Sequence, residues 1–152
     1  MKRFLKSVFP FLPAALYYGL IFHVSSRTVE LPFDFPGRYG DKAFHILEFS
    51  VLGWLLAFGF HGIQEFSAHL RHASAFFVGT ALGVLDELHQ SFVPGRHAEI
   101  MDAIADAAGV AIGLLIFGIT CRILAVSHQR GNRPLDHSKS PACKQRDSKP
   151  SG

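Results

Sequence analysis

The chain has 152 residues, of which 49% are hydrophobic and only 18% are charged, whereas roughly 25% of residues are charged in the usual soluble domain. Its length fits one domain. Its formal charge is +3, and most of the excess of basic residues lies from Arg122 onward, whereas the aromatic residues lie in apolar runs. This distribution argues against nucleic-acid binding, which needs a basic patch or stripe on the folded surface.

Four apolar segments follow one another along the chain, at residues 8–24, 43–60, 73–88 and 100–124. A membrane-spanning helix needs about 20 residues and can be as short as about 17, so the first and last segments are long enough as they stand. The second is long enough when His45 and Glu48 are tolerated within it. The third reaches that length only by carrying Asp86, Glu87 and Gln90 at its end.

These segments predict an all-α fold, a bundle of four transmembrane helices over residues 1–125, followed by a disordered basic tail at 126–152. A soluble bundle of long buried helices is the alternative, but the segments lack the charged outer face of such helices. For the first segment a cleaved signal peptide is the alternative, but no small-x-small cleavage pattern follows it.

The distribution of Lys and Arg predicts the orientation of this bundle. Four spans place eleven of these residues on the side of the termini and four, namely Arg27, Arg38, Lys42 and Arg96, on the other side. Because cytoplasmic loops carry the excess of Lys and Arg, we expect both termini in the cytoplasm. The loops at 25–40 and 91–99 are then expected to face outward.

Polar residues recur at helical spacing near that outward end, so that in each helix they share one face. The second helix carries Asp41, His45 and Glu48, the third carries Asp86, Glu87 and Gln90, and the fourth carries Asp102 and Asp106. Glycines at spacing four, Gly79 with Gly83 and Gly109 with Gly113, predict close packing of these faces within the chain. The sequence therefore predicts one polar site at the outward end of the bundle.

The carboxylates of this site outnumber its fixed cations, Lys42 and Arg96, and charges in the lipid region need partners. Three remedies stay open: Arg96 pairs with an aspartate, some carboxylates hold protons, or a cation binds. His45 has two interpretations, a packing residue or a ligand. Glu99 is left outside the predicted site because an acidic residue favours the start of a helix in any case.

Two blocks, DKAFHILEFSVLG at 41–53 and DELHQSFVPGRHAEIMDAIADAAGVAIG at 86–113, resemble the VanZ-like family of small bacterial membrane proteins. The resemblance implies a four-helix protein of the bacterial inner membrane, and the founding member of the family is linked to resistance toward teicoplanin-type glycopeptides. Many relatives carry asparagine at position 106. The polar positions of the family fall here at Lys42, His45, Glu48, Asp86, Glu87, Gln90, Arg96, Asp102 and Asp106. The resemblance implies no particular reaction.

Two functions compete for this site. The first is recognition of a lipid headgroup, a lipid-linked cell-wall molecule or a glycopeptide, with Lys42 and Arg96 meeting phosphate or carboxylate. The second is a hydrolase or transferase acting on such a molecule, with His45 and Glu48 as an acid–base pair or with a divalent metal. The candidate metal ligands are His45, Glu48, Asp86, Glu87, Asp102 and Asp106. Ion conduction is disfavoured because the polar residues occupy one end of the bundle. Whether the chain is an enzyme, and whether it dimerises, stay open.

Overall fold

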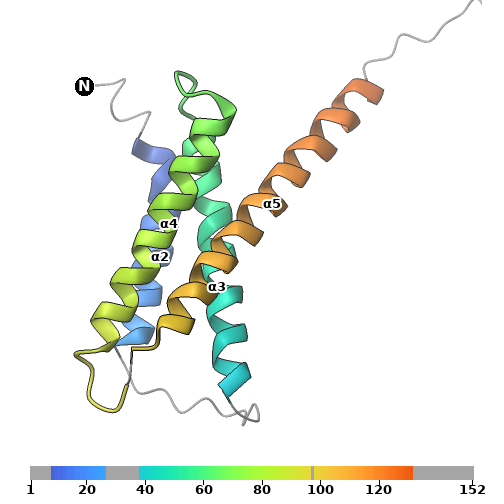
Figure 1. The fold of residues 1–152 in the computed structure, drawn as a ribbon. Coiled ribbons are helices and arrows are strands. Elements are labelled where there is room, and N and C mark those ends of the chain that lie inside the picture. Colours follow the sequence, from blue (N-terminus) through green and yellow to red (C-terminus); the bar gives the residue numbers. More distant parts are fainter. Residues whose placement is uncertain (1–7, 27–37, 97, 132–152) are drawn as a thin grey trace, which may run out of the picture. The chain divides into compact units, whose positions relative to one another are not determined.

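The computed structural model describes residues 8–26, 38–96 and 98–131, which form helices and no strand. In chain order these are the short 3-10 helix η1 (Phe9–Phe11) and the α-helices α2 (Leu12–Ser25), α3 (Arg38–His61), α4 (Ala68–Gln90) and α5 (Ile100–Gly131) (Figure 1). The prediction of an all-α fold is confirmed for this part of the chain.

Two of these helices are long and apolar enough to cross a membrane, Gly40–His61 within α3 and Ile100–His128 within α5. A shorter apolar helix, Phe9–Ser25, combines η1 with α2. The helix α4 has 23 residues, so it is about 34 Å long at about 1.5 Å per residue, but it carries polar residues at both ends. Each expected apolar segment thus lies within a helical region of the structure.

The chain divides into two compact units, Met1–Thr120 and Cys121–Gly152, and the described part of the second is the C-terminal portion of α5. We expected the tail to be disordered from residue 126, whereas α5 continues to Gly131. No glycine or proline interrupts the sequence between 126 and 130, so no residue stops the helix earlier. Residues 132–152 of the expected tail lie outside the described residues.

Local sequence explains where α4 begins and how the chain leaves its end. Ser67 caps α4, since its hydroxyl accepts a hydrogen bond from the backbone N–H of Leu70 at 3.2 Å. After α4, the backbone N–H of Arg96 donates to the carbonyl of Val93 at 3.1 Å, across Pro94 and Gly95. Gly95 has φ of 83°, which suits the third position of a type II turn and favours glycine there. This turn directs Arg96 back toward the end of α4.

Glycines let α5 approach α3 and α4 closely within the first unit. A Cβ atom placed on Gly109 would lie 2.5 Å from the carbonyl oxygen of Ile46, and one on Gly53 would lie 2.6 Å from that of Val110. A Cβ atom on Gly79 would lie 2.8 Å from the side chain of Val110. The expected packing of small-residue faces within the chain is therefore confirmed.

Burial along α4 is the reverse of that in a soluble helix. Asp86, Glu87 and Gln90 are buried, whereas large apolar side chains such as Phe77 and Leu88 are exposed. The same holds on α5, where Asp106 is fully buried and Leu115 is exposed. An apolar exterior over a polar interior is what a helix bundle in lipid requires.

Candidate functional site

The ends of four helices meet where the buried polar residues gather. Figure 1 shows that α2 and α4 end, and α3 and α5 begin, at the same end of the first unit. Hydrogen bonds and ion pairs connect the polar side chains there across the helices. We call this set the polar cluster: Ser25, Lys42, His45, Asp86, Glu87, Gln90, Arg96, Glu99, Asp102 and Asp106.

Lys42 on α3 binds two carboxylates at the start of α5. Its Nζ donates to Oδ1 of Asp102 at 2.6 Å and to Oε2 of Glu99 at 3.1 Å. The Asp102 side chain is 6% exposed, so the ammonium group compensates a nearly buried charge. Because Lys42 itself is 24% exposed, it also borders the outside of the cluster.

His45 lies one turn further along α3 and pairs with the most deeply buried carboxylate. Its Nδ1 lies 2.9 Å from Oδ1 of Asp106, and both side chains are almost completely buried. Within residues 8–26, 38–96 and 98–131, Oδ2 of Asp106 has no hydrogen-bond partner. The pair also lies beside Glu87, since ligand-type atoms of His45, Glu87 and Asp106 are all within 4.8 Å of one another.

A second chain of hydrogen bonds runs from α2 through α4 to the turn. Asp86 Oδ2 accepts from the Ser25 hydroxyl at 2.8 Å and from Nε2 of Gln90 at 2.7 Å. The other end of the Gln90 amide accepts two hydrogen bonds from Arg96, from Nε at 3.2 Å and from Nη2 at 2.9 Å. Arg96 thus binds the amide oxygen of Gln90, and in the described residues it forms no ion pair with an aspartate.

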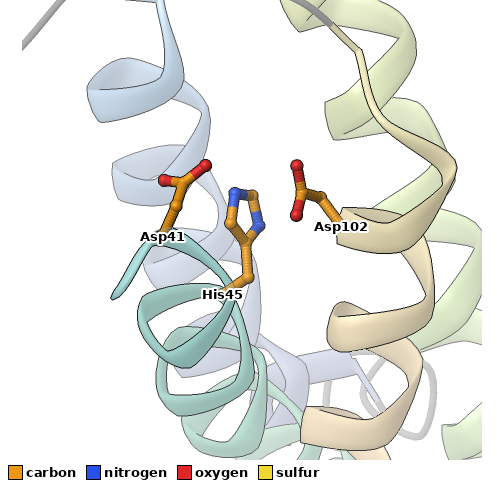
Figure 2. Close-up of side chains that lie close together, drawn as sticks. All are labelled: Asp41, His45 and Asp102. Carbon is orange, nitrogen blue, oxygen red and sulfur yellow. The ribbon is translucent and has the colours of Figure 1, made fainter. Parts of the chain in front are cut away.

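His45 also belongs to a second group of possible metal ligands, shown in Figure 2 with Asp41 and Asp102. The imidazole of His45 stands between the two carboxylates, which come from α3 and α5 (Figure 2). One ligand-type atom from each of the three residues lies within 4.8 Å of the others. Asp41 is exposed, so this group reaches the surface, whereas the group of His45, Glu87 and Asp106 is entirely buried.

The structure brings together eight of the nine predicted site residues in the polar cluster, namely Lys42, His45, Asp86, Glu87, Gln90, Arg96, Asp102 and Asp106. Glu48 is half-buried on α3 and makes no hydrogen bond or ion pair with a described residue.

Two members of the cluster were not predicted. The sequence offered a signal for Ser25, because this residue directly follows the first apolar segment, at the end of the bundle where the polar site is expected. Glu99 was set aside as a helix-start residue, yet it also binds Lys42, and its backbone N–H donates to Oε2 of Glu87 at 3.0 Å.

The polar cluster combines excess buried negative charge with donors near its surface. Asp86, Glu87 and Asp106 each retain one buried carboxylate oxygen that has no partner in the part of the chain that the structure describes. Arg96 is half-buried, and its two hydrogen bonds to Gln90 leave the other N–H groups of the guanidinium without an acceptor among these same residues. The surface of the cluster therefore suits an anion and its interior suits a cation.

The comparisons with known proteins identify one family. A family model described as VanZ/LLP1 matches residues 5–121, which include all of η1, α2, α3, α4 and the polar cluster. No curated protein and no solved structure gives a significant match.

Proposed function

The chain belongs to the VanZ/LLP1 family, and from this membership and the polar cluster we propose that it recognises an anionic group of a lipid or lipid-linked molecule of the bacterial cell envelope. The family and the two apolar helices indicate a membrane protein. Lipid headgroups, lipid-linked cell-wall precursors and glycopeptides all carry phosphate or carboxylate groups, which is the chemistry that Arg96 and Lys42 bind.

The proposal places the protein in the bacterial inner membrane with four spans and both termini in the cytoplasm. The support is the excess of Lys and Arg on the side of the termini, together with the apolar exterior of α4. The polar cluster then lies at the outward end, where envelope lipids and glycopeptides meet the membrane surface.

Cysteine labelling tests this orientation. In a chain whose own Cys121 and Cys143 are replaced by serine, we expect Ser91→Cys to react with a membrane-impermeant maleimide in intact cells. Gln64→Cys, in the exposed connection between α3 and α4, should react only after the cells are opened. Reaction of Gln64→Cys alone in intact cells would reverse the orientation and overturn the proposed outward site.

The observation that carries the recognition proposal is the position of Arg96. The turn at Pro94 and Gly95 holds its guanidinium over Gln90, and this amide anchors it in turn to Asp86. A cation fixed in place with unused donors binds an anion without first losing much conformational freedom. Lys42, with its side chain 24% exposed, supplies a second cation at the same end.

Binding measurements on the full chain in lipid nanodiscs test this role. The ligands are an anionic phospholipid, a polyprenyl-linked cell-wall precursor and teicoplanin, each titrated separately, so that the arms distinguish the possible sources of the anion. We expect Arg96→Gln to weaken binding of the true ligand by roughly tenfold or more, since a hydrogen bond to a charged group contributes about 1.5–3 kcal/mol. Arg96→Lys should lose less.

Arg71→Gln is the matched control for that experiment. Arg71 lies at the opposite end of α4, where its Nη1 donates to the carbonyl of His61 at 3.1 Å. This variant should bind as the wild type does. If Arg96→Gln binds all three ligands like the wild type, or if Arg71→Gln loses as much, the proposed anion site is wrong.

A second candidate function is a hydrolase or transferase acting on the same class of lipid-linked molecule, and the pairing of His45 with Asp106 favours it. A carboxylate on Nδ1 orients an imidazole and leaves its Nε2 available for general acid–base catalysis. Turnover of the lipid-linked precursor by the purified protein, lost in His45→Gln, would support this function. Binding without turnover would leave recognition as the function.

A further inference from the structure

A buried group of three side chains lies beneath the surface residues of the polar cluster. His45 comes from α3, Glu87 from α4 and Asp106 from α5, and their side chains offer ligand-type atoms within 4.8 Å of one another. The three residues are 3%, 6% and 0% exposed. Three helices thus bring an imidazole and two carboxylates to one point inside the protein.

Two carboxylate oxygens in this group have no partner among the described residues. There, Oε1 of Glu87 and Oδ2 of Asp106 are buried and accept no hydrogen bond, although the second oxygen of each carboxylate does accept one. More than about 90% of buried polar groups in proteins are paired, and an unpaired charged group is especially costly. Two such oxygens within one group indicate that a further positive partner belongs there.

The charges of the neighbouring residues indicate what kind of partner fits. Lys42 is already bound by Glu99 and Asp102, and Arg96 donates to Gln90, so neither compensates Glu87 or Asp106 directly. With a neutral imidazole, the two carboxylates carry two negative charges. A divalent cation balances this charge and satisfies both unpaired oxygens.

We propose that His45, Glu87 and Asp106 bind one divalent transition-metal cation of the Zn²⁺ or Mn²⁺ class. Imidazole favours zinc and other transition metals over Mg²⁺ and Ca²⁺, while carboxylates suit Zn²⁺ and Mn²⁺ alike. Ligand atoms about 2.1 Å from a common ion lie roughly 3–3.4 Å apart. The ligand-type atoms of His45, Glu87 and Asp106 all lie within 4.8 Å of one another, so the widest pair closes by at most about 1.4 Å to reach that spacing.

The site has three protein ligands and therefore leaves coordination positions open. An open position is what separates a zinc site that binds water or substrate from a purely structural one. The neighbouring group of Asp41, His45 and Asp102 shares the imidazole and reaches the exposed Asp41 (Figure 2). The metal site does not depend on the proposed anion recognition, because its residues are different from Arg96 and Lys42.

Metal titration of the full chain tests the inference. The protein is purified in detergent, stripped with a chelator and titrated with Zn²⁺ or Mn²⁺ alone, with bound metal measured by mass spectrometry. We expect one ion per chain, bound much more tightly than Mg²⁺. Glu87→Gln and Asp106→Asn should each weaken binding by roughly tenfold or more.

Glu65→Gln is the control, because Glu65 is an exposed carboxylate in the connection between α3 and α4, at the opposite end of α4 from Glu87. This variant should keep its metal affinity. Far-ultraviolet circular dichroism shows whether each variant is folded. The absorption spectrum of the wild-type protein with Co²⁺ reports ligation by nitrogen and oxygen, and this measurement does not depend on whether any variant folds.

Each outcome decides the proposal. If the wild-type chain binds no Zn²⁺ or Mn²⁺, the inference is wrong, and a proton on a carboxylate or a protonated His45 compensates the charge of the group instead. Equal loss in Glu65→Gln, or full binding in Glu87→Gln, would place the ion elsewhere and also overturn it. Anion binding in nanodiscs is measured separately, so the failure of one proposal is distinguishable from the failure of the other.

Discussion

A close approach between α3 and α5 provides a direct test of how the site is assembled. A Cβ atom on Gly109 would lie 2.5 Å from the carbonyl oxygen of Ile46 and 3.0 Å from Cβ of Phe49. Ordinary contact begins near 3.4 Å, so Gly109→Ala requires a displacement of about 0.9 Å between two helix backbones. Overpacking of this kind costs about 1–3 kcal/mol.

Gly118→Ala is the matched control on the same helix. A Cβ atom on Gly118 would meet no described atom within 4 Å apart from its chain neighbours and the nearby backbone of its own helix. Replacing glycine by alanine inside a helix stabilises it by about 0.5–1 kcal/mol, and this gain is shared by both variants. The difference in the free energy of unfolding between the two variants therefore isolates the overpacking cost, which we expect to be about 1–3 kcal/mol in favour of Gly118→Ala.

Unfolding of both variants by sodium dodecyl sulfate in mixed micelles, followed by far-ultraviolet circular dichroism, measures this difference. Gly109→Ala should also impair metal binding, because Gly109 lies one turn beyond Asp106 on α5 and the displacement would separate Asp106 from His45. If the two variants unfold within about 0.5 kcal/mol of each other, the close approach of α3 and α5 and the assembly of the site through it are refuted.

Two further predictions concern the interior of the polar cluster. Ser25→Ala removes the 2.8 Å hydrogen bond to Asp86, and we expect it to lower the free energy of unfolding by about 1.5–3 kcal/mol in the same titration. Ser91→Ala, which removes an exposed hydroxyl bonded to the carbonyl of Leu88 in the turn before it, should change it by less than about 0.5 kcal/mol, and equal effects would contradict the role of Ser25. Gly83→Ala would place a Cβ atom 2.8 Å from Cβ of Asp106 and 3.0 Å from its Oδ2, so it should weaken Zn²⁺ binding by roughly tenfold. Unchanged metal titration in Gly83→Ala would show that Asp106 is not held against α4 as described.

The sequence alone was sufficient to predict the helical segments, the end of the bundle at which the polar residues lie, and the family. These features depend on local properties, namely the length of an apolar run, the spacing of polar residues along a helix, and the residues that cap it or turn the chain. The turn at Pro94 and Gly95 is an example, because proline followed by glycine is typical of a type II turn, in which the glycine has a positive φ such as the 83° of Gly95. The extent of α5 beyond residue 125 was missed because the loss of apolar residues there does not by itself end a helix.

Only the tertiary structure decided which polar residues pair. Pairing of Arg96 with an aspartate was one of three possibilities that the sequence left open, and Arg96 binds Gln90 instead. Lys42 binds Asp102 and Glu99 from 57 to 60 positions away. Such pairs depend on the rotation of each helix about its axis, because successive side chains point in directions about 100° apart around that axis. That rotation is fixed by contacts between helices, such as the backbone of α5 at Gly109 against Ile46. The sequence therefore determined that a polar site forms at one end of the bundle, and the packing of α3, α4 and α5 determined its pairs.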